Sequence, residues 1–128
     1  MANNVTLVDT VATNDVYQVG SAFSTAYVMP ATEGTLVFNA DGSFTYDPAA
    51  TFAGVVSFSY QVCLPAPNGT VCDTATQTIV VGANAIDDSD TVAHDVTLVD
   101  SVATNDVYPV GSVFSTTYVM PASQGTLV

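Results

Sequence analysis

The chain has 128 residues, of which 12 are Asp or Glu and none is Lys or Arg, so its formal net charge is -12. Nucleic acid is close to excluded as a partner because phosphate contacts depend on Lys and Arg, and an anionic membrane surface is disfavoured by the same sign of charge. No apolar run approaches the roughly 20 residues of a membrane helix, so membrane insertion is not expected.

The acidic composition leaves two interpretations open. Oxygen-rich side chains without competing lysines attract hard divalent cations, of which calcium fits best. The same acids would also keep an extracellular fibre soluble without binding any metal. The start of the chain, residues 1–10, has neither the basic nor the apolar region of a signal peptide.

A segment near the start of the chain, about a third of the repeat unit, recurs near its end. Residues 5–37 recur 91 residues further on as residues 96–128, and the two copies differ at only 6 of 33 positions. Such near-identity indicates recent tandem duplication, so we expect the chain to be an excerpt of a longer array. A period of 91 residues is too long for solenoid repeats and matches the size of an immunoglobulin-like sandwich.

The middle of the repeat predicts strands in series. Alternating segments 35–39 and 43–47 flank an Asp-Gly pair, which is a strong hairpin signal. Segment 56–63 alternates apolar with polar residues, and segment 72–81 alternates again and is rich in β-branched residues. No segment has a helical period, so the unit is predicted to be all-β. The expected core aromatic residues are Phe44, Tyr46, Phe52, Phe58 and Tyr60.

The two cysteines flank the turn between the last two predicted strands. Cys63 ends one strand and Cys72 begins the next, and paired hairpin strands bring such positions within reach of a disulfide. The spacing does not resemble a zinc motif. We therefore expect a hairpin disulfide, which in turn implies an oxidising, extracytoplasmic setting.

Several strings in this order resemble a known family. They are NADGSFTYDP, FAGVVSFSYQV, DTATQTIVV and the linker ANAIDDSDTVAHD, and together they cover essentially the whole period. They closely resemble the bacterial cadherin-like or immunoglobulin-like tandem repeats of large surface adhesins. The resemblance implies an antiparallel β-sandwich of that class in each 91-residue repeat.

The linker gathers four acids within nine residues. The cadherin-like resemblance implies calcium at such a domain junction, where the ATND turn of the second copy is expected to add further oxygens. The expected calcium ligands are Asp87, Asp88, Asp90, Asp95, Asn105 and Asp106. The family's calcium pattern is not reproduced in full, and the alternative is that these residues are solvated turn residues that satisfy their own backbone.

In repeats of this kind the domain begins near Ala83. Residues 1–82 are then predicted to form a sandwich without its first strand, and residues 83–128 to supply the linker and the opening third of the next repeat. The absent strand would correspond to residues such as Asp87–Asp95. An unpaired edge and an incomplete apolar tail invite pairing with another copy. Strand donation between copies would build a fibre, whereas a continuous array would complete both ends within one chain.

The sequence contains no sign of an enzyme. It has no phosphate-binding loop, no nucleophile elbow and no general base beyond His94, so catalysis is not expected. The expected function is a structural repeat module of a bacterial extracellular adhesin or fibre at the cell surface, either a stiff spacer or a self-assembling filament unit. The alternative is a binding module that recognises a glycan or protein through loops at one end of the sandwich.

The differences between the two repeat copies favour the spacer. They are scattered and conservative, whereas a binding module should vary at its loop tips. The expected partners are adjacent repeats or other copies of the chain, arranged head to tail.

Overall fold

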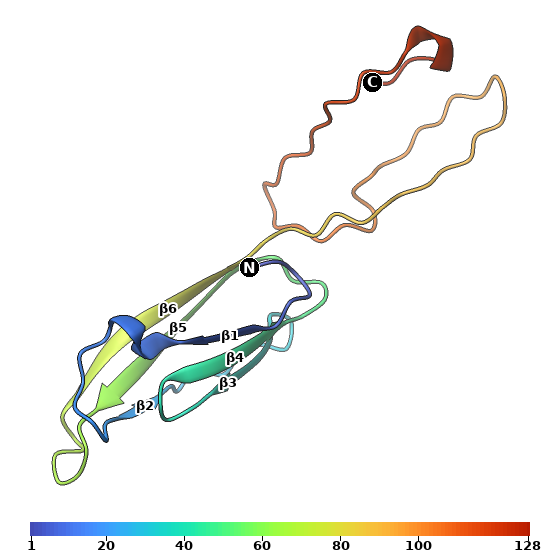
Figure 1. Cartoon of the computed structure of the whole chain (residues 1–128). Helices are drawn as coiled ribbons and strands as arrows, with labels where there is room; N and C mark the ends of the chain where they lie inside the picture. Colours follow the sequence, from blue (N-terminus) through green and yellow to red (C-terminus); the bar gives the residue numbers. More distant parts are fainter.

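The computed structural model describes residues 1–128 and places every strand before residue 82 (Figure 1). The strands are β1 (Leu7–Thr10), β2 (Ala22–Ser24), β3 (Gly34–Phe38), β4 (Ser43–Pro48), β5 (Gly54–Cys63) and β6 (Cys72–Val81). Two short 3-10 helices, η1 (Val11–Asn14) and η2 (Ala122–Gln124), are the only other regular elements. No helix is long and apolar enough to cross a membrane.

The six strands form two three-stranded sheets with the orders β1-β4-β3 and β2-β5-β6. Every pair of neighbouring strands is antiparallel. The longest ladder joins β5 to β6 over ten residue pairs, from Gly54 opposite Val81 to Cys63 opposite Cys72. The all-β antiparallel sandwich predicted from the sequence is confirmed.

Alternation along β5 builds the core between the sheets. Val56, Phe58 and Tyr60 are buried, whereas Val55 points outward. The phenyl rings of Phe58 and Phe44 meet edge to face, with centroids 5.9 Å apart, a favourable arrangement for aromatic pairs. The nine buried apolar residues are Val11, Phe23, Phe44, Tyr46, Val56, Phe58, Tyr60, Ile79 and Val81. Of the predicted core aromatic residues, only Phe52 lies at the margin, half-buried against this cluster.

The predicted hairpin around Asp41 and Gly42 joins β3 to β4. The carboxylate of Asp41 accepts hydrogen bonds from the backbone N–H and the hydroxyl of Ser43, at 2.9 and 2.6 Å. These bonds lower the pKa of Asp41 because they favour its ionised form. Gly42 has φ 84°, a conformation that side-chain-bearing residues rarely adopt, so glycine is required at this turn.

The N-terminus pairs with the end of β6. The terminal amine of Met1 donates to the carbonyl of Val80 at 2.7 Å, and the N–H of Gly82 donates to the carbonyl of Met1 at 2.9 Å. By the 91-residue offset, residues 1–4 are the equivalents of residues 92–95. The absent strand was expected to correspond to Asp87–Asp95. Its last four residues have counterparts in residues 1–4, so only 87–91 have none before residue 5.

Residues 83–128 leave the sandwich at the end where the N-terminus lies and form a long open loop (Figure 1). They contain no strand, and one isolated bridge joins Asn84 to Val107. We call residues 96–128 the tail. Its local contacts repeat those of the folded copy, since Tyr108 and Phe114 meet edge to face at 5.0 Å, as do Tyr17 and Phe23.

Burial separates the two copies. Phe23 and Val11 are each 3% exposed in the sandwich, whereas their tail equivalents Phe114 and Val102 are 47% and 60% exposed. Local sequence is therefore sufficient for the turns and the aromatic pair of this segment. Burial of its apolar side chains requires the remaining strands of a repeat.

The two faces of β5 supply a matched test of the core. Val56→Ala should lower the free energy of unfolding by about 2 kcal/mol, because it removes buried methyl groups and leaves a cavity. Val55→Ala removes the same atoms at a position that is 60% exposed and should change it by less than about 0.5 kcal/mol. Urea unfolding of both variants measures the difference, and equal effects would contradict the assignment of faces.

Completing the second repeat should fold the tail. If a second copy of residues 38–82 is appended after Val128, the apolar side chains of the tail gain the strands they lack, and their backbone amides should become protected. Hydrogen exchange measures the protection of residues 96–128 with and without the extension. A scrambled extension of the same composition is the control, and tail amides that exchange equally fast in both chains would contradict the prediction.

Candidate functional site at the junction between repeats

The linker is held against the ATND turn of the tail by backbone contacts. Asn84 and Val107 exchange two backbone hydrogen bonds, at 2.8 and 2.9 Å. The carboxylate of Asp106 accepts from the N–H of Ile86 at 2.7 Å. The amide of Asn105 donates to the carbonyl of Asp87 at 3.3 Å. The turn therefore does approach the junction, and it does so by hydrogen bonding the linker backbone.

The corresponding turn in the sandwich bonds to the core. The carboxylate of Asp15, the equivalent of Asp106, accepts from the hydroxyl of Tyr60 at 2.9 Å. Burial, and then this hydrogen bond, raise the pKa of Tyr60 because both favour the neutral phenol. A carboxylate has two oxygens, so one Asp at this position can hold both the core tyrosine and the linker backbone in a complete repeat.

The remaining linker acids make separate contacts. The carboxylate of Asp95 lies 2.7 Å from Nδ1 of His94. The neighbouring carboxyl of Asp100 raises the pKa of Asp90, because a hydrogen bond between two carboxyl groups requires one of them to be protonated. Asp100 was not among the predicted ligands. No pattern in the sequence pointed to Asp100, because its proximity to Asp90 joins segments ten residues apart.

The six predicted calcium ligands do not form one cluster in this arrangement. No group of three or more His, Cys, Asp or Glu side chains lies close enough together to hold a metal ion. Calcium needs six to eight oxygen ligands around one point. The geometry therefore does not fit a calcium site as it stands, and calcium binding by these residues stays a prediction.

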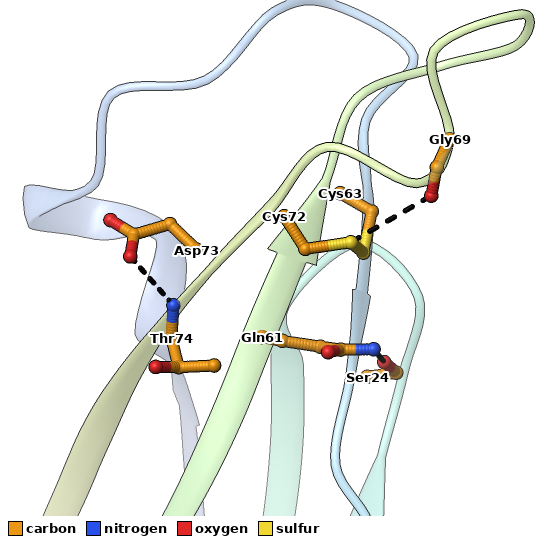
Figure 2. Close-up of a disulfide and its surroundings, with 7 residues drawn as sticks. All are labelled: Ser24, Gln61, Cys63, Gly69, Cys72, Asp73 and Thr74. Carbon is orange, nitrogen blue, oxygen red and sulfur yellow. Dashed lines mark hydrogen bonds between the residues drawn. A yellow bond between two sulfur atoms is a disulfide. The ribbon is translucent and has the colours of Figure 1, made fainter.

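The disulfide lies at the opposite end of β6 from the linker. Cys63 and Cys72 are directly opposite in the β5–β6 ladder, their Cα atoms are 4.1 Å apart and their sulfurs are bonded (Figure 2). The bond closes the loop between the two strands. It therefore fixes the register of the longest ladder at the end where the exposed loop 64–71 begins.

Comparison with known families decides the class of the module. Residues 1–82 match the family model of the bacterial Ig domain. The chain belongs to the bacterial Ig domain family. No curated protein and no solved structure matches it. The resemblance to bacterial immunoglobulin-like repeats and the immunoglobulin-like fold are thereby confirmed. Bacterial Ig domains form a non-catalytic fold family, are typical of surface proteins and are commonly extracellular.

Removing the disulfide should weaken the module without abolishing it. The Cys63→Ala, Cys72→Ala double variant should lose at most about 3 kcal/mol of unfolding free energy, because the bond closes a short loop. Urea unfolding compares it with the oxidised wild type, and the reduced wild type controls for the changed side chains. Unfolding of the double variant in the absence of denaturant would contradict the view that the core alone sustains this sandwich.

Proposed function

We propose that this bacterial Ig domain is a structural repeat module of an extracellular adhesin or fibre and acts as a stiff spacer in a tandem array. The observation that carries the proposal is the length of the connection. β6 ends at Val81, and Asn84 already pairs with the turn of the next repeat, so only two residues lie between the modules. A connection this short leaves neighbouring modules little freedom to bend.

The bonding pattern also supports a head-to-tail order of modules. The linker leaves one module at the Val81 end of β6 and enters the next beside its ATND turn. In the sandwich, the equivalent turn lies by Asp73, close to the disulfide end of β6. The Val81 end of one module would thus face the disulfide end of the next, and the closed loop 64–71 would help to rigidify each junction.

The disulfide and the absence of Lys and Arg both agree with a location outside the cell. A structural disulfide persists in oxidising compartments. The chain has no Lys or Arg, so it offers trypsin-like proteases no cleavage site. The proposed partners are the adjacent repeats of the array or other copies of the chain, and no catalytic role is proposed.

The second candidate function is ligand binding through sandwich-end loops. The observation that favours it is the exposed loop 64–71, which the disulfide holds in place. In a head-to-tail array this loop would lie at a junction, which restricts access to it. We therefore place the spacer first.

Small-angle X-ray scattering of chains with one, two and four complete repeats tests the spacer. The maximum dimension should grow by a constant step of about 35 Å or more per repeat, because a ten-residue strand such as β6 spans about 33 Å. A flexible Gly-Ser insertion after Gly82 is the matched control and should shorten the four-repeat chain. Equal dimensions with and without the insertion would reject a stiff spacer.

The same measurement in calcium and in a chelator tests the remaining metal prediction. If the linker acids bind calcium, the ion must draw together carboxylates that now make separate contacts, and the four-repeat chain should lengthen in calcium. Replacing Asp87 and Asp88 by Asn should remove the difference. Identical scattering in calcium and chelator would leave the junction stiffened by hydrogen bonds alone.

A further inference from the structure

The turn before β1 is held to the sandwich by one buried polar side chain. Asn3 is 7% exposed. Its side-chain amide donates a hydrogen bond to the backbone carbonyl of Phe52, in the loop between β4 and β5. No backbone N–H donates to this carbonyl, so Asn3 supplies its hydrogen bond. The side chain of Asn3 thus ties the start of the repeat to the loop that precedes β5.

The same turn recurs at the end of the linker. By the 91-residue offset, Asn3 and Asn4 correspond to His94 and Asp95. Asn4 and Asp95 both have φ 60°, the left-handed conformation that Asn and Asp adopt more readily than most residues with a side chain. They are the only residues of the chain other than glycine that have a positive φ. The two segments therefore form the same turn, one packed on the sandwich and the other open.

The residues that lead into the two turns also match in type. Met1 packs against the hydrophobic core, and its equivalent Val92 is apolar as well. Ala2 and Ala93 are the same residue. Segment 92–95 therefore carries side chains that suit the position of residues 1–4 in a complete repeat.

A histidine can make the hydrogen bond that Asn3 makes. Nδ1 of histidine and Nδ2 of asparagine are separated from Cα by the same number of bonds, and both can donate a hydrogen. In the sandwich, Oδ1 of Asn3 is buried and has no hydrogen-bond partner. A histidine places the carbon Cδ2 at that point instead. Exchange of asparagine for histidine therefore keeps the donor and removes an unpaired buried acceptor, which is costly to leave unpaired.

In the open turn, Nδ1 of His94 has a different partner. The imidazole is 93% exposed, and its Nδ1 lies 2.7 Å from the carboxylate of Asp95. A pair between neighbouring exposed side chains contributes little to stability, so it does not hold the ring against a buried partner. The loop equivalent to residues 49–53 belongs to the part of the repeat that comes after the tail.

We propose that His94 is the buried anchor of the following repeat, where its Nδ1–H donates to the backbone carbonyl at the position of Phe52. This anchor requires tandem repeats but no particular function of the array, so it goes beyond the spacer. Residues 92–95 then belong to the folded part of the following repeat. Asp95 serves as the left-handed residue of the turn, with its side chain at the surface as that of Asn4 is.

Variants of Asn3 test the anchor in the folded sandwich of the full chain. Asn3→His should unfold at nearly the same urea concentration as the wild type, because the donor is kept. Asn3→Leu fills the site without a donor and leaves the carbonyl of Phe52 unpaired, so its unfolding equilibrium constant should rise about tenfold. A histidine variant as unstable as the leucine variant would overturn the proposal.

Nuclear magnetic resonance of labelled histidine rings detects the hydrogen bond itself. In Asn3→His the new ring N–H should exchange slowly with water and show a nuclear Overhauser contact with the backbone of Phe52. The exposed ring of His94 in the same molecule is the internal reference and should exchange fast. Asn4→His is the matched control, because Asn4 is exposed and histidine tolerates its left-handed conformation. Fast exchange in Asn3→His, or equally slow exchange in the control, would contradict the proposed bond.

The natural histidine is tested in the chain that carries a second copy of residues 38–82 after Val128. The ring N–H of His94 should become slowly exchanging there, together with the backbone amides of the tail. Protected tail amides beside a fast-exchanging His94 ring would overturn the proposal, and if the tail amides stay unprotected, the variants of Asn3 decide it. Failure of the spacer is recognised separately, because it is read from the scattering of multi-repeat chains, whereas the Asn3 variants concern a single sandwich.

Discussion

The β5–β6 ladder is the interaction on which the rest of the structure depends. Its ten residue pairs bring Val56, Phe58 and Tyr60 to one face, where they form the centre of the core. The disulfide closes one end of the ladder, and the linker leaves from the other. Because β6 is the edge strand, the same ladder also presents the free backbone groups at the side of the module. The pairing of β5 with β6 thus determines the core, the position of the junction and the exposed edge of the sheet.

The sequence predicted the parts of the fold that follow from strict alternation. Along β5 every second residue is apolar, and the buried residues are those that the alternation indicates. The predicted ligand set had no such support. Asp87 and Asp90 are close in sequence, but an extended backbone turns successive side chains to opposite faces. Asp87 bonds Asn105 through its backbone carbonyl, whereas the carboxyl of Asp90 neighbours Asp100. The importance of Asp100 depends on contacts between distant segments, which periodicity does not report.

The two copies of the 33-residue segment show where local determination ends. Thr25 and Thr116 each accept a hydrogen bond from the backbone N–H two residues on, whether the segment is packed or open. The aromatic pair also forms in both contexts. Strands β1 and β2 and the burial of the apolar side chains occur only in the packed copy, because both depend on strands β3 to β6. The turn hydrogen bonds therefore depend on the sequence of this segment alone. The free energy gained by burying its apolar side chains requires the completed repeat.

The duplication also decides which kind of contact between copies lowers the free energy. The tail could replace residues 5–37 of another copy, but the two segments are nearly identical, so the exchange would form the contacts that it breaks. It would gain no burial and would cost the entropy of association. The linker is no freer to exchange, since the N–H groups of Asn84 and Ile86 already bond Val107 and Asp106 of its own tail. A tandem array of near-identical repeats therefore has no driving force for exchanging this segment between copies.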